Sequence, residues 1–149
     1  MLLMKKVAVY INILNCSLIK YFAKELSRND INLTPEQYLV MDVLWDAETL
    51  SQQAIADIIQ KDKNSVTKFI DSLEKKGLVY RAINKKDRRV NDIIVTEEGM
   101  KLKVPTTEVA INLMRNVLKD IKEEDLISFD KVMNQIKENI DEAVKDVEN

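Results

Sequence analysis

The chain has 149 residues, enough for one hydrophobic core, and its apolar fraction of 46% and charged fraction of 32% are typical of a helix-rich globular protein. It contains two glycines and two prolines, too few for a turn-rich β protein. It has no histidine and one cysteine, Cys16, so it lacks the commonest general base and metal ligand and cannot form an internal disulfide. We therefore expect a protein of the reducing cytoplasm with no metal, no other cofactor and no enzyme activity.

Charge is distributed unevenly along the chain, although the formal net charge is only −2. Residues 61–103 carry twelve Lys or Arg against seven Asp or Glu, whereas residues 104–149 carry six against eleven. A local positive field can steer a polyanion even when the whole protein is weakly acidic. The distribution therefore predicts a nucleic-acid-binding segment between residues 61 and 103.

The N-terminal residues predict an amphipathic helix from about Leu3 to Ser27, whose main apolar stripe continues past Cys16. Further apolar residues lie off that stripe, at Val9, Ile13 and Ile19. A helix that is apolar on more than one face needs neighbours on two sides, so we expect a subunit interface. A lipoprotein signal ending at Cys16 is the alternative, but Asn15 stands where such signals have a small residue. We expect no apolar stretch of membrane-spanning length and no membrane partner.

Residues 29–62 predict two helices separated by a short extended piece. Thr34-Pro35-Glu36-Gln37 has the residues of a capping box, with proline at the first helical position. Thr49-Leu50 is expected to be extended, and Ser51 is expected to cap a helix that runs to Ile59.

Residues 63–76 predict a helix with one apolar face and one open polar face. Asp62 can cap this helix, and Gly77 is the kind of residue that ends one. The apolar face carries Val66, Phe69, Ile70 and Leu73, and the open face carries Asn64, Ser65, Thr67, Lys68, Asp71 and Ser72. Short hydrogen-bonding side chains with a cation can contact base edges and phosphates in a DNA major groove. A solvated helix face is the simpler interpretation.

Residues 78–95 predict a two-stranded hairpin with a basic tip. Apolar strands at 78–83 and 91–95 flank Asn84-Lys85-Lys86-Asp87-Arg88-Arg89, and Asn84 is placed at the turn because Asn tolerates left-handed backbone. Five cations fall within residues 81–89, more than solubility requires. Two helices followed by a basic hairpin predict a winged helix-turn-helix, a mainly α fold with a small β-wing.

The remaining residues predict two helices. Thr96 is expected to cap a long helix that Pro105 bends, and a last helix begins near Glu123. Its apolar residues recur at steps of three and four from Leu126 to Val147, which predicts packing on a second subunit. We therefore divide one domain, residues 1–149, into a DNA-binding lobe at 33–99 and dimerisation helices at 1–28 and 100–149.

Six motifs in this chain resemble, in order and spacing, those of the MarR family of bacterial transcriptional regulators. They are Leu33-Thr34-Pro35-Glu36-Gln37, Ser51-Gln52-Gln53-Ala54-Ile55-Ala56, Asn64-Ser65-Val66-Thr67, Leu73-Glu74-Lys75-Lys76-Gly77-Leu78-Val79, Asp87-Arg88-Arg89 and Val95-Thr96-Glu97-Glu98-Gly99. Each motif is weak by itself, but the ordered set is specific. The flanking helices match only in length and pattern.

The resemblance implies a homodimer of triangular outline, whose N- and C-terminal helices form the base and whose two lobes grip a palindromic site on double-stranded DNA. It also implies a repressor that a small, often aromatic, molecule or an oxidant releases. The chain departs from the family at Asn84-Lys85-Lys86, where relatives commonly carry a proline. Cys16 lies a turn or more beyond the cysteine of peroxide-sensing relatives, and metal-sensing relatives need histidines, so we expect neither mode.

The polar residues of the two short helices are the candidate DNA contacts. In the recognition helix, the candidates are Asn64, Thr67 and Lys68 for bases and Lys63 and Ser65 for phosphates. At the start of the preceding helix, where free amides and the helix dipole favour phosphate, they are Ser51, Gln52 and Gln53. Capping alone also accounts for Ser51.

In the wing, Arg88 or Arg89 would enter the minor groove, whose negative potential attracts arginine. The resemblance implies that Asp87 pairs with Arg89 and shapes the tip, which leaves Arg88 free. The remaining wing cations, expected to contact the phosphate backbone, are Arg81, Lys85 and Lys86.

An effector would bind between the dimer base and the lobe. Its candidate lining is Tyr10, Tyr21, Phe22, Met41 and Trp45, although core packing is the simpler interpretation of each. Cys16 is expected to be a buried helical thiol rather than a redox group.

A winged-helix protein-interaction module that lacks DNA binding is the alternative function. Asp71 and the acidic C-terminal half favour it. The basic wing argues against it, because a protein-docking surface would carry more exposed apolar residues.

Overall fold

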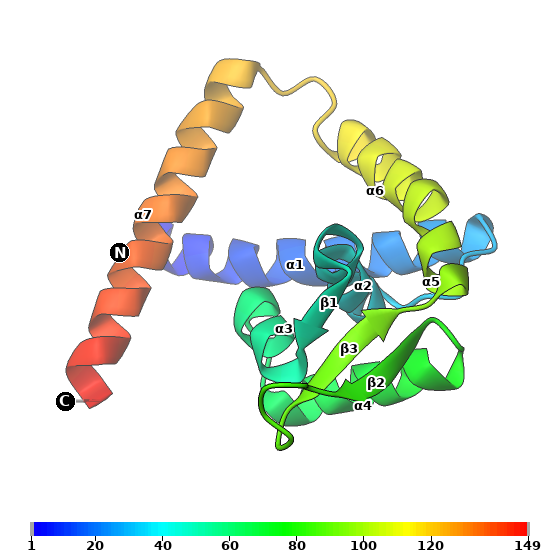
Figure 1. The fold of residues 1–149 in the computed structure, drawn as a ribbon. Helices are drawn as coiled ribbons and strands as arrows, with labels where there is room; N and C mark the ends of the chain where they lie inside the picture. The colour runs from blue at the N-terminus through cyan, green and yellow to red at the C-terminus, as the bar shows by residue number, and fades with distance from the viewer. Residues whose placement is uncertain (1, 149) are drawn as a thin grey trace. The chain divides into compact units, whose positions relative to one another are not determined.

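The computed structural model describes residues 2–148, and it confirms a mainly helical chain with a small β-wing. The elements in chain order are α1 (Leu2–Arg28), α2 (Pro35–Ala47), β1 (Thr49–Ser51), α3 (Gln52–Ile59), α4 (Lys63–Lys75), β2 (Val79–Ile83), β3 (Asn91–Val95), α5 (Glu97–Lys101), α6 (Lys103–Val117) and α7 (Glu123–Glu148) (Figure 1). The chain divides into two compact units, Met1–Leu113 and Met114–Asn149. The first unit contains the sheet and the candidate DNA-binding elements.

The helix starts form as their local sequence predicts. In the capping box of α2, the Gln37 amide donates to Thr34 Oγ1 over 3.2 Å and the Thr34 amide donates to Gln37 Oε1 over 3.1 Å. Ser51 Oγ accepts from the Ala54 amide over 3.1 Å at the start of α3. These side chains satisfy amides that have no partner within the helix, which fixes where each helix begins.

The sheet has three antiparallel strands in the order β1-β3-β2, one strand more than the expected hairpin. Thr49 is in register with Ile94, and Arg81 is in register with Ile93 on the other side of β3. The pairing joins Thr49-Leu50 to a strand some forty residues later, and the local sequence carries no sign of it. Strand β2 is consequently an edge strand, and its other side lies toward α4.

The core of the first unit is assembled from α1, α2, α3, α4 and the sheet. Its fully buried side chains include Leu26, Met41, Leu44, Ile55, Val66, Ile70, Leu73 and Ile93. Trp45 Nε1 donates to the Gly99 carbonyl oxygen over 2.9 Å, which ties α2 to α5. Gly99 has no room for a side chain, since a Cβ there would overlap the Leu78 carbonyl oxygen and lie 2.8 Å from Val95 Cγ1.

The expectation of one long helix from Thr96, bent at Pro105, was wrong in detail. The structure has two helices, α5 and α6, which are separated at Leu102. The ring of a proline clashes with the carbonyl four residues earlier, here that of Lys101, and proline has no amide to donate. The first helix therefore ends at Lys101, and Pro105 occupies the first turn of α6, where it is tolerated.

Helix α1 corrects two expectations. It is long and apolar enough to cross a membrane by length and composition, with mean hydropathy 1.5 in its most apolar window, although we expected no such stretch. An apolar run broken by a few polar residues still reaches this average. Cys16 is exposed in this chain rather than buried. Toward its C-terminal end α1 packs on the lobe, because Leu26 is fully buried and the Phe22 ring meets Tyr38 edge-on, with centroids 4.8 Å apart.

The second unit contains α7, which begins at Glu123 as expected. Acidic residues fill its first turn, where negative charge is stabilised by the helix dipole. Large apolar side chains are exposed along its length: Ile127, Phe129, Val132, Ile140, Val144 and Val147.

Candidate nucleic-acid interface

Helix α4 begins at a charged cap. The Asp62 carboxylate accepts from the Ser65 amide over 2.9 Å and from the Ser65 hydroxyl over 2.6 Å. These hydrogen bonds, the hydroxyl first, lower the pKa of Asp62 below its usual value, so the cap stays ionised at neutral pH. The Ser65 hydroxyl therefore already donates its hydrogen bond to Asp62, which argues against Ser65 as a hydrogen-bond donor to a DNA phosphate.

The N-terminal half of α4 presents three exposed polar side chains: Lys63, Asn64 and Lys68. None of these side chains has a hydrogen bond or an ion pair within residues 2–148. Two cations and an amide are thus available to a partner at the end of the helix that a major groove would receive.

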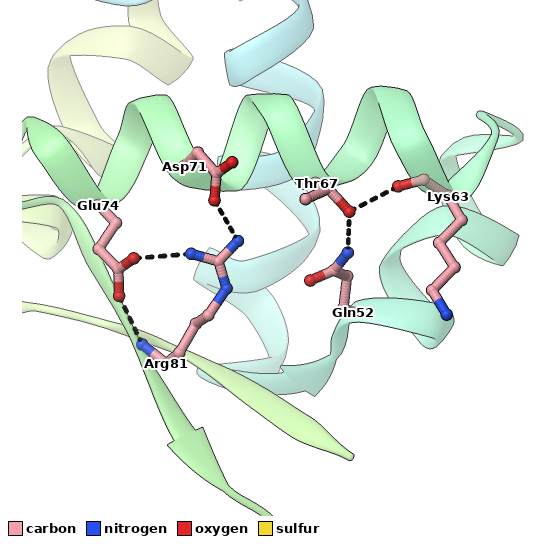
Figure 2. A network of polar contacts seen from close by, with 6 residues as sticks. All are labelled: Gln52, Lys63, Thr67, Asp71, Glu74 and Arg81. Carbon is pink, nitrogen blue, oxygen red and sulfur yellow. Dashed lines mark hydrogen bonds and ion pairs between the residues drawn. The ribbon is translucent and has the colours of Figure 1, made fainter. Parts of the chain in front are cut away.

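Thr67 lies between these residues, but its hydroxyl is already used. Thr67 Oγ1 donates to the Lys63 carbonyl oxygen over 2.8 Å and accepts from Gln52 Nε2. Dashed lines in Figure 2 mark both contacts. Thr67 therefore has no free proton for a base, and its methyl group remains for contact with thymine. The same contact joins the start of α3 to α4, and it draws the Gln52 amide toward α4.

The other two residues at the start of α3 also have partners within the chain. Ser51 caps the helix, and Gln53 Nε2 donates to Asp57 Oδ1 over 2.8 Å on the exposed surface. Gln53 is exposed, and a side-chain hydrogen bond between exposed residues of one helix is weak enough for a ligand to replace it.

Asn84 organises the tip of the wing by its side chain. Its Oδ1 accepts from the Lys86 amide over 2.8 Å and from the Asp87 amide over 3.0 Å, while its Nδ2 donates to the Asp92 carboxylate. Among the described residues, Asn84 is not one of those with positive φ, so the expected left-handed backbone was wrong. The turn is instead held by an Asn side chain that imitates a backbone acceptor.

The pairing of Asp87 with Arg89 is confirmed. Arg89 Nη2 lies 3.0 Å from Asp87 Oδ2, and Arg89 Nε donates to Asp87 Oδ1 over 3.1 Å. This pairing lowers the pKa of Asp87 and raises the pKa of Arg89, so both groups stay charged. Lys85, Lys86 and Arg88 are exposed, and their side chains have no partner in the described part of the chain, which makes Arg88 the free arginine of the tip.

Arg81 is not free, although we expected it to contact the DNA backbone. Its guanidinium lies 2.6 Å from Asp71 Oδ1 and 2.6 Å from Glu74 Oε2, both on α4 (Figure 2). Our sequence analysis missed this cluster. The available signal was the spacing of Asp71 and Glu74, which puts two carboxylates on one helix face a few residues before an arginine.

A second polar cluster fixes the C-terminal half of α4 to the start of α2. The buried Gln37 donates from Nε2 to Ser72 Oγ over 2.8 Å, and Lys76 Nζ donates to Gln37 Oε1 over 2.8 Å and to the Asn32 carbonyl oxygen over 2.9 Å. Ser72 therefore faces α2, and its expected place on the open face was wrong. Burial lowers the pKa of Lys76.

The candidate effector residues separate into two groups. Met41 and Trp45 are buried in the core, and Phe22 packs against it. Tyr21 is half-buried, whereas Tyr10 is 56% exposed further along α1. Tyr38, which we did not include, joins the first group, because its ring centroid lies 4.8 Å from that of Phe22 and 6.2 Å from that of Trp45. Burial, followed by the nearby Asp42, raises the pKa of Tyr38 to about 12.

A helix with free polar side chains at its N-terminal half, a preceding short helix and a β-wing with a basic tip define a winged helix-turn-helix protein. Residues 33–90 match the MarR family. The matched segment runs from the start of α2 to the wing, and the curated proteins of similar sequence are transcriptional regulators.

Two curated relatives cover most of the chain. It is 27% identical over 100 residues to the organic hydroperoxide resistance transcriptional regulator of Bacillus subtilis, covering 63% of this chain and 68% of that protein. It is 26% identical over 129 residues to the HTH-type transcriptional regulator SarZ of Staphylococcus aureus, covering 86% of this chain and 84% of that protein.

Solved structures share the fold at lower identity. A MarR transcriptional regulator from Methanosarcina mazei superposes with a TM-score of 0.79 at 20% identity, covering 91% of this chain and 96% of that one. The S. aureus MepR–DNA complex superposes with a TM-score of 0.84 at 20% identity, covering 90% of this chain and 97% of that one.

Proposed function

We propose that this chain is a cytoplasmic, homodimeric repressor that binds a palindromic operator and is released from it by a small aromatic molecule. The observation that carries the proposal is the set of unpaired polar side chains on α4 and the wing: Lys63, Asn64, Lys68, Lys85, Lys86 and Arg88. They lie on the two elements that a winged helix offers to the major and minor grooves.

Each group has a role that its chemistry suits. Asn64 can pair with adenine and Lys68 with guanine, while Lys63 contacts phosphate. Arg88 enters the minor groove, and the Asp87–Arg89 pair holds the shape of the tip. The MepR structure and a structure of reduced AbfR, both neighbours by fold, are complexes with DNA, which supports this proposal.

The exposed apolar faces of α1 and α7 support the homodimer. Large side chains such as Ile13 and Leu14 in α1 and Phe129 and Val132 in α7 are exposed in the single chain, more than a soluble monomer presents. Residues 1–28 and 100–149 then form the dimer base, and residues 33–99 form the lobe. A twofold axis between two lobes requires an inverted repeat in the DNA. The burial of Leu26 in the lobe favours this role for α1 over a membrane anchor.

The effector part of the proposal has support from one neighbour by fold. The organohalide-sensing regulator RdhR has been solved with 2,4-dichlorophenol, an aromatic molecule. In this chain the aromatic side chains of Phe22, Tyr38 and Trp45 lie together where α1 meets α2. A ligand that binds better to a dimer with wrongly spaced lobes would release the DNA without touching it.

The experiment is binding of the purified protein to duplex DNA from just upstream of its own gene, by fluorescence anisotropy at several salt concentrations. We expect selective binding that weakens steeply with salt, and loss of binding in an Arg88→Ala, Arg89→Ala variant. A Lys119→Ala, Lys122→Ala variant removes the same charge from the acidic half and should bind as the wild type does. Weak binding that is equal for all sequences would contradict the proposal and favour the protein-interaction module.

A further inference from the structure

Arg81 lies where the wing meets the recognition helix. Its side chain is only 22% exposed, and the guanidinium bridges two carboxylates one helical turn apart, Asp71 and Glu74. Figure 2 shows the three side chains between α4 and the start of the wing, separate from the Gln52–Thr67 contact further along the helix. We refer to Arg81, Asp71 and Glu74 as the α4–β2 clamp.

Glu74 holds the backbone of Arg81 as well as its side chain. Its Oε1 accepts from the Arg81 amide over 3.1 Å, and its Oε2 accepts from Arg81 Nη1 over 2.6 Å. Because β2 is an edge strand, this amide has no partner in the sheet, and the carboxylate of α4 takes that place. One side chain of the helix thus fixes both the position of the strand and the direction of the arginine.

The charge of the clamp disfavours a phosphate at Arg81. Two carboxylates and one guanidinium leave a net charge of −1, so a phosphate that approached Arg81 would have to displace one carboxylate and would still meet the other. Cations without a partner among the described residues are found at the N-terminal half of α4, Lys63 and Lys68, and at the wing tip, Lys85, Lys86 and Arg88.

We propose that Arg81 is a positioning residue for DNA recognition, and that the α4–β2 clamp fixes the basic wing tip relative to the base-contacting end of α4. The inference rests on the proposed DNA-binding function. It replaces the role expected for Arg81 from the sequence, a direct contact with phosphate.

The two roles predict opposite results for Arg81→Lys. A lysine keeps the charge and could still hold a phosphate, but a single ammonium cannot reach two carboxylates as the planar guanidinium does. If Arg81 is a positioning residue, the ratio of operator to non-operator affinity falls in Arg81→Lys by about fivefold, the size expected for loss of a partly buried ion-pair network. If Arg81 holds a phosphate, the ratio stays at the wild-type value, and the inference is overturned.

A charge-matched pair of variants provides the second arm. Asp71→Asn, Glu74→Gln removes two negative charges from the clamp, and Glu97→Gln, Glu98→Gln removes two from exposed positions at the start of α5. Simple electrostatics raises operator and non-operator affinity together in both. The clamp proposal requires the ratio to fall in the first variant and to stay constant in the second. An equal ratio in the two variants would overturn it.

A measurement without DNA separates this inference from the proposed function. Hydrogen exchange of the Arg81 amide, followed by NMR, should accelerate roughly fivefold in Glu74→Ala, because that amide loses its acceptor, while amides of the β1–β3 ladder should not change. Unchanged exchange at Arg81 would refute the clamp. Failure of the wild type to select any DNA sequence would refute the proposed function, and the exchange result would still decide whether the clamp exists.

Discussion

The two halves of α4 differ in how far their polar side chains are used within the protein. The N-terminal half leaves Lys63, Asn64 and Lys68 unpaired among the described residues, whereas in the C-terminal half Asp71 and Glu74 bind Arg81 and Ser72 binds Gln37. The C-terminal half is held by α2 and β2 through hydrogen bonds and ion pairs, while the N-terminal half is joined to α3 through Thr67 and keeps these three side chains available. A recognition helix needs both properties, because a contact with a base has value only if the helix that carries it is held in place.

The largest expected effect comes from breaking the apolar anchor that both halves share. Ile70 is fully buried in the core, and Ile70→Ala should cost about 3 kcal/mol of the free energy of unfolding, from lost burial and the remaining cavity. Lys68→Ala, two residues earlier on the exposed face, should change it by less than about 0.5 kcal/mol. Urea denaturation measures both. Similar losses in the two variants would contradict the division of the helix into an anchored and an open face.

The polar anchor is tested by Gln37→Met, which keeps the bulk of the side chain and removes its amide. Lys76 Nζ then loses one of its two acceptors, the Thr34 amide loses its acceptor in the capping box, and Ser72 loses its donor. We therefore expect a loss of about 2 kcal/mol in the free energy of unfolding. Gln53→Met changes an exposed glutamine of α3 and should be nearly neutral. An unchanged unfolding midpoint in Gln37→Met would mean that the cluster contributes nothing to stability.

The open regions are tested by comparing the two arginines of the wing tip. Arg88 has no partner among residues 2–148, whereas Arg89 is paired with Asp87. Arg88→Ala should therefore reduce the slope of log affinity against log salt concentration by about 1 for each lobe. Arg89→Ala should leave that slope nearer the wild-type value and weaken binding through a less ordered tip. Anisotropy titrations over a range of salt distinguish the two arginines, and a larger change of slope in Arg89→Ala would reverse their roles.

The smallest expected effect concerns the cap of α4. Hydrogen bonds from Ser65 lower the folded-state pKa of Asp62 below the unfolded value of 3.8. On acidification the unfolded state therefore takes up the Asp62 proton at a higher pH than the folded state does. The contribution of Asp62 to the free energy of unfolding is complete above the unfolded pKa, and it is lost as the pH falls through the lowered folded-state pKa. Melting temperatures from about pH 2 to about pH 6 should fall less steeply on acidification in Asp62→Asn, which caps without titrating. Parallel curves would show that the cap does not contribute to the pH dependence.

What could be predicted from the sequence depended on the range of the interaction. The capping box at Thr34 and the caps at Ser51 and Asp62 involve residues three positions apart, so the local sequence reports them fully. The pairing of Asp87 with Arg89, which leaves Arg88 unpaired, was implied by the resemblance to the MarR family and not by the local sequence.

Contacts between distant segments could not be predicted in the same way. The pairing of β1 with β3, the position of Ser72 against Gln37 and the ion pairs of Arg81 depend on how a helix and a strand pack together. No local pattern distinguishes an arginine that is free to bind a phosphate from one that is already ion-paired with two carboxylates. The sequence therefore indicated which elements are basic, but it did not indicate which of their cations are already paired within the chain.

The close approach at Gly99 has a consequence for attempts to engineer this chain. Replacing a helical glycine by alanine is a common way to stabilise a protein, and α5 would be an obvious place to try it. Here the added methyl group would meet the Leu78 carbonyl oxygen, at the point where the base of the wing and the start of α5 meet. In a saturation library screened for folded protein, this position should keep glycine alone, and selection for a more helical α5 should succeed only at its other residues.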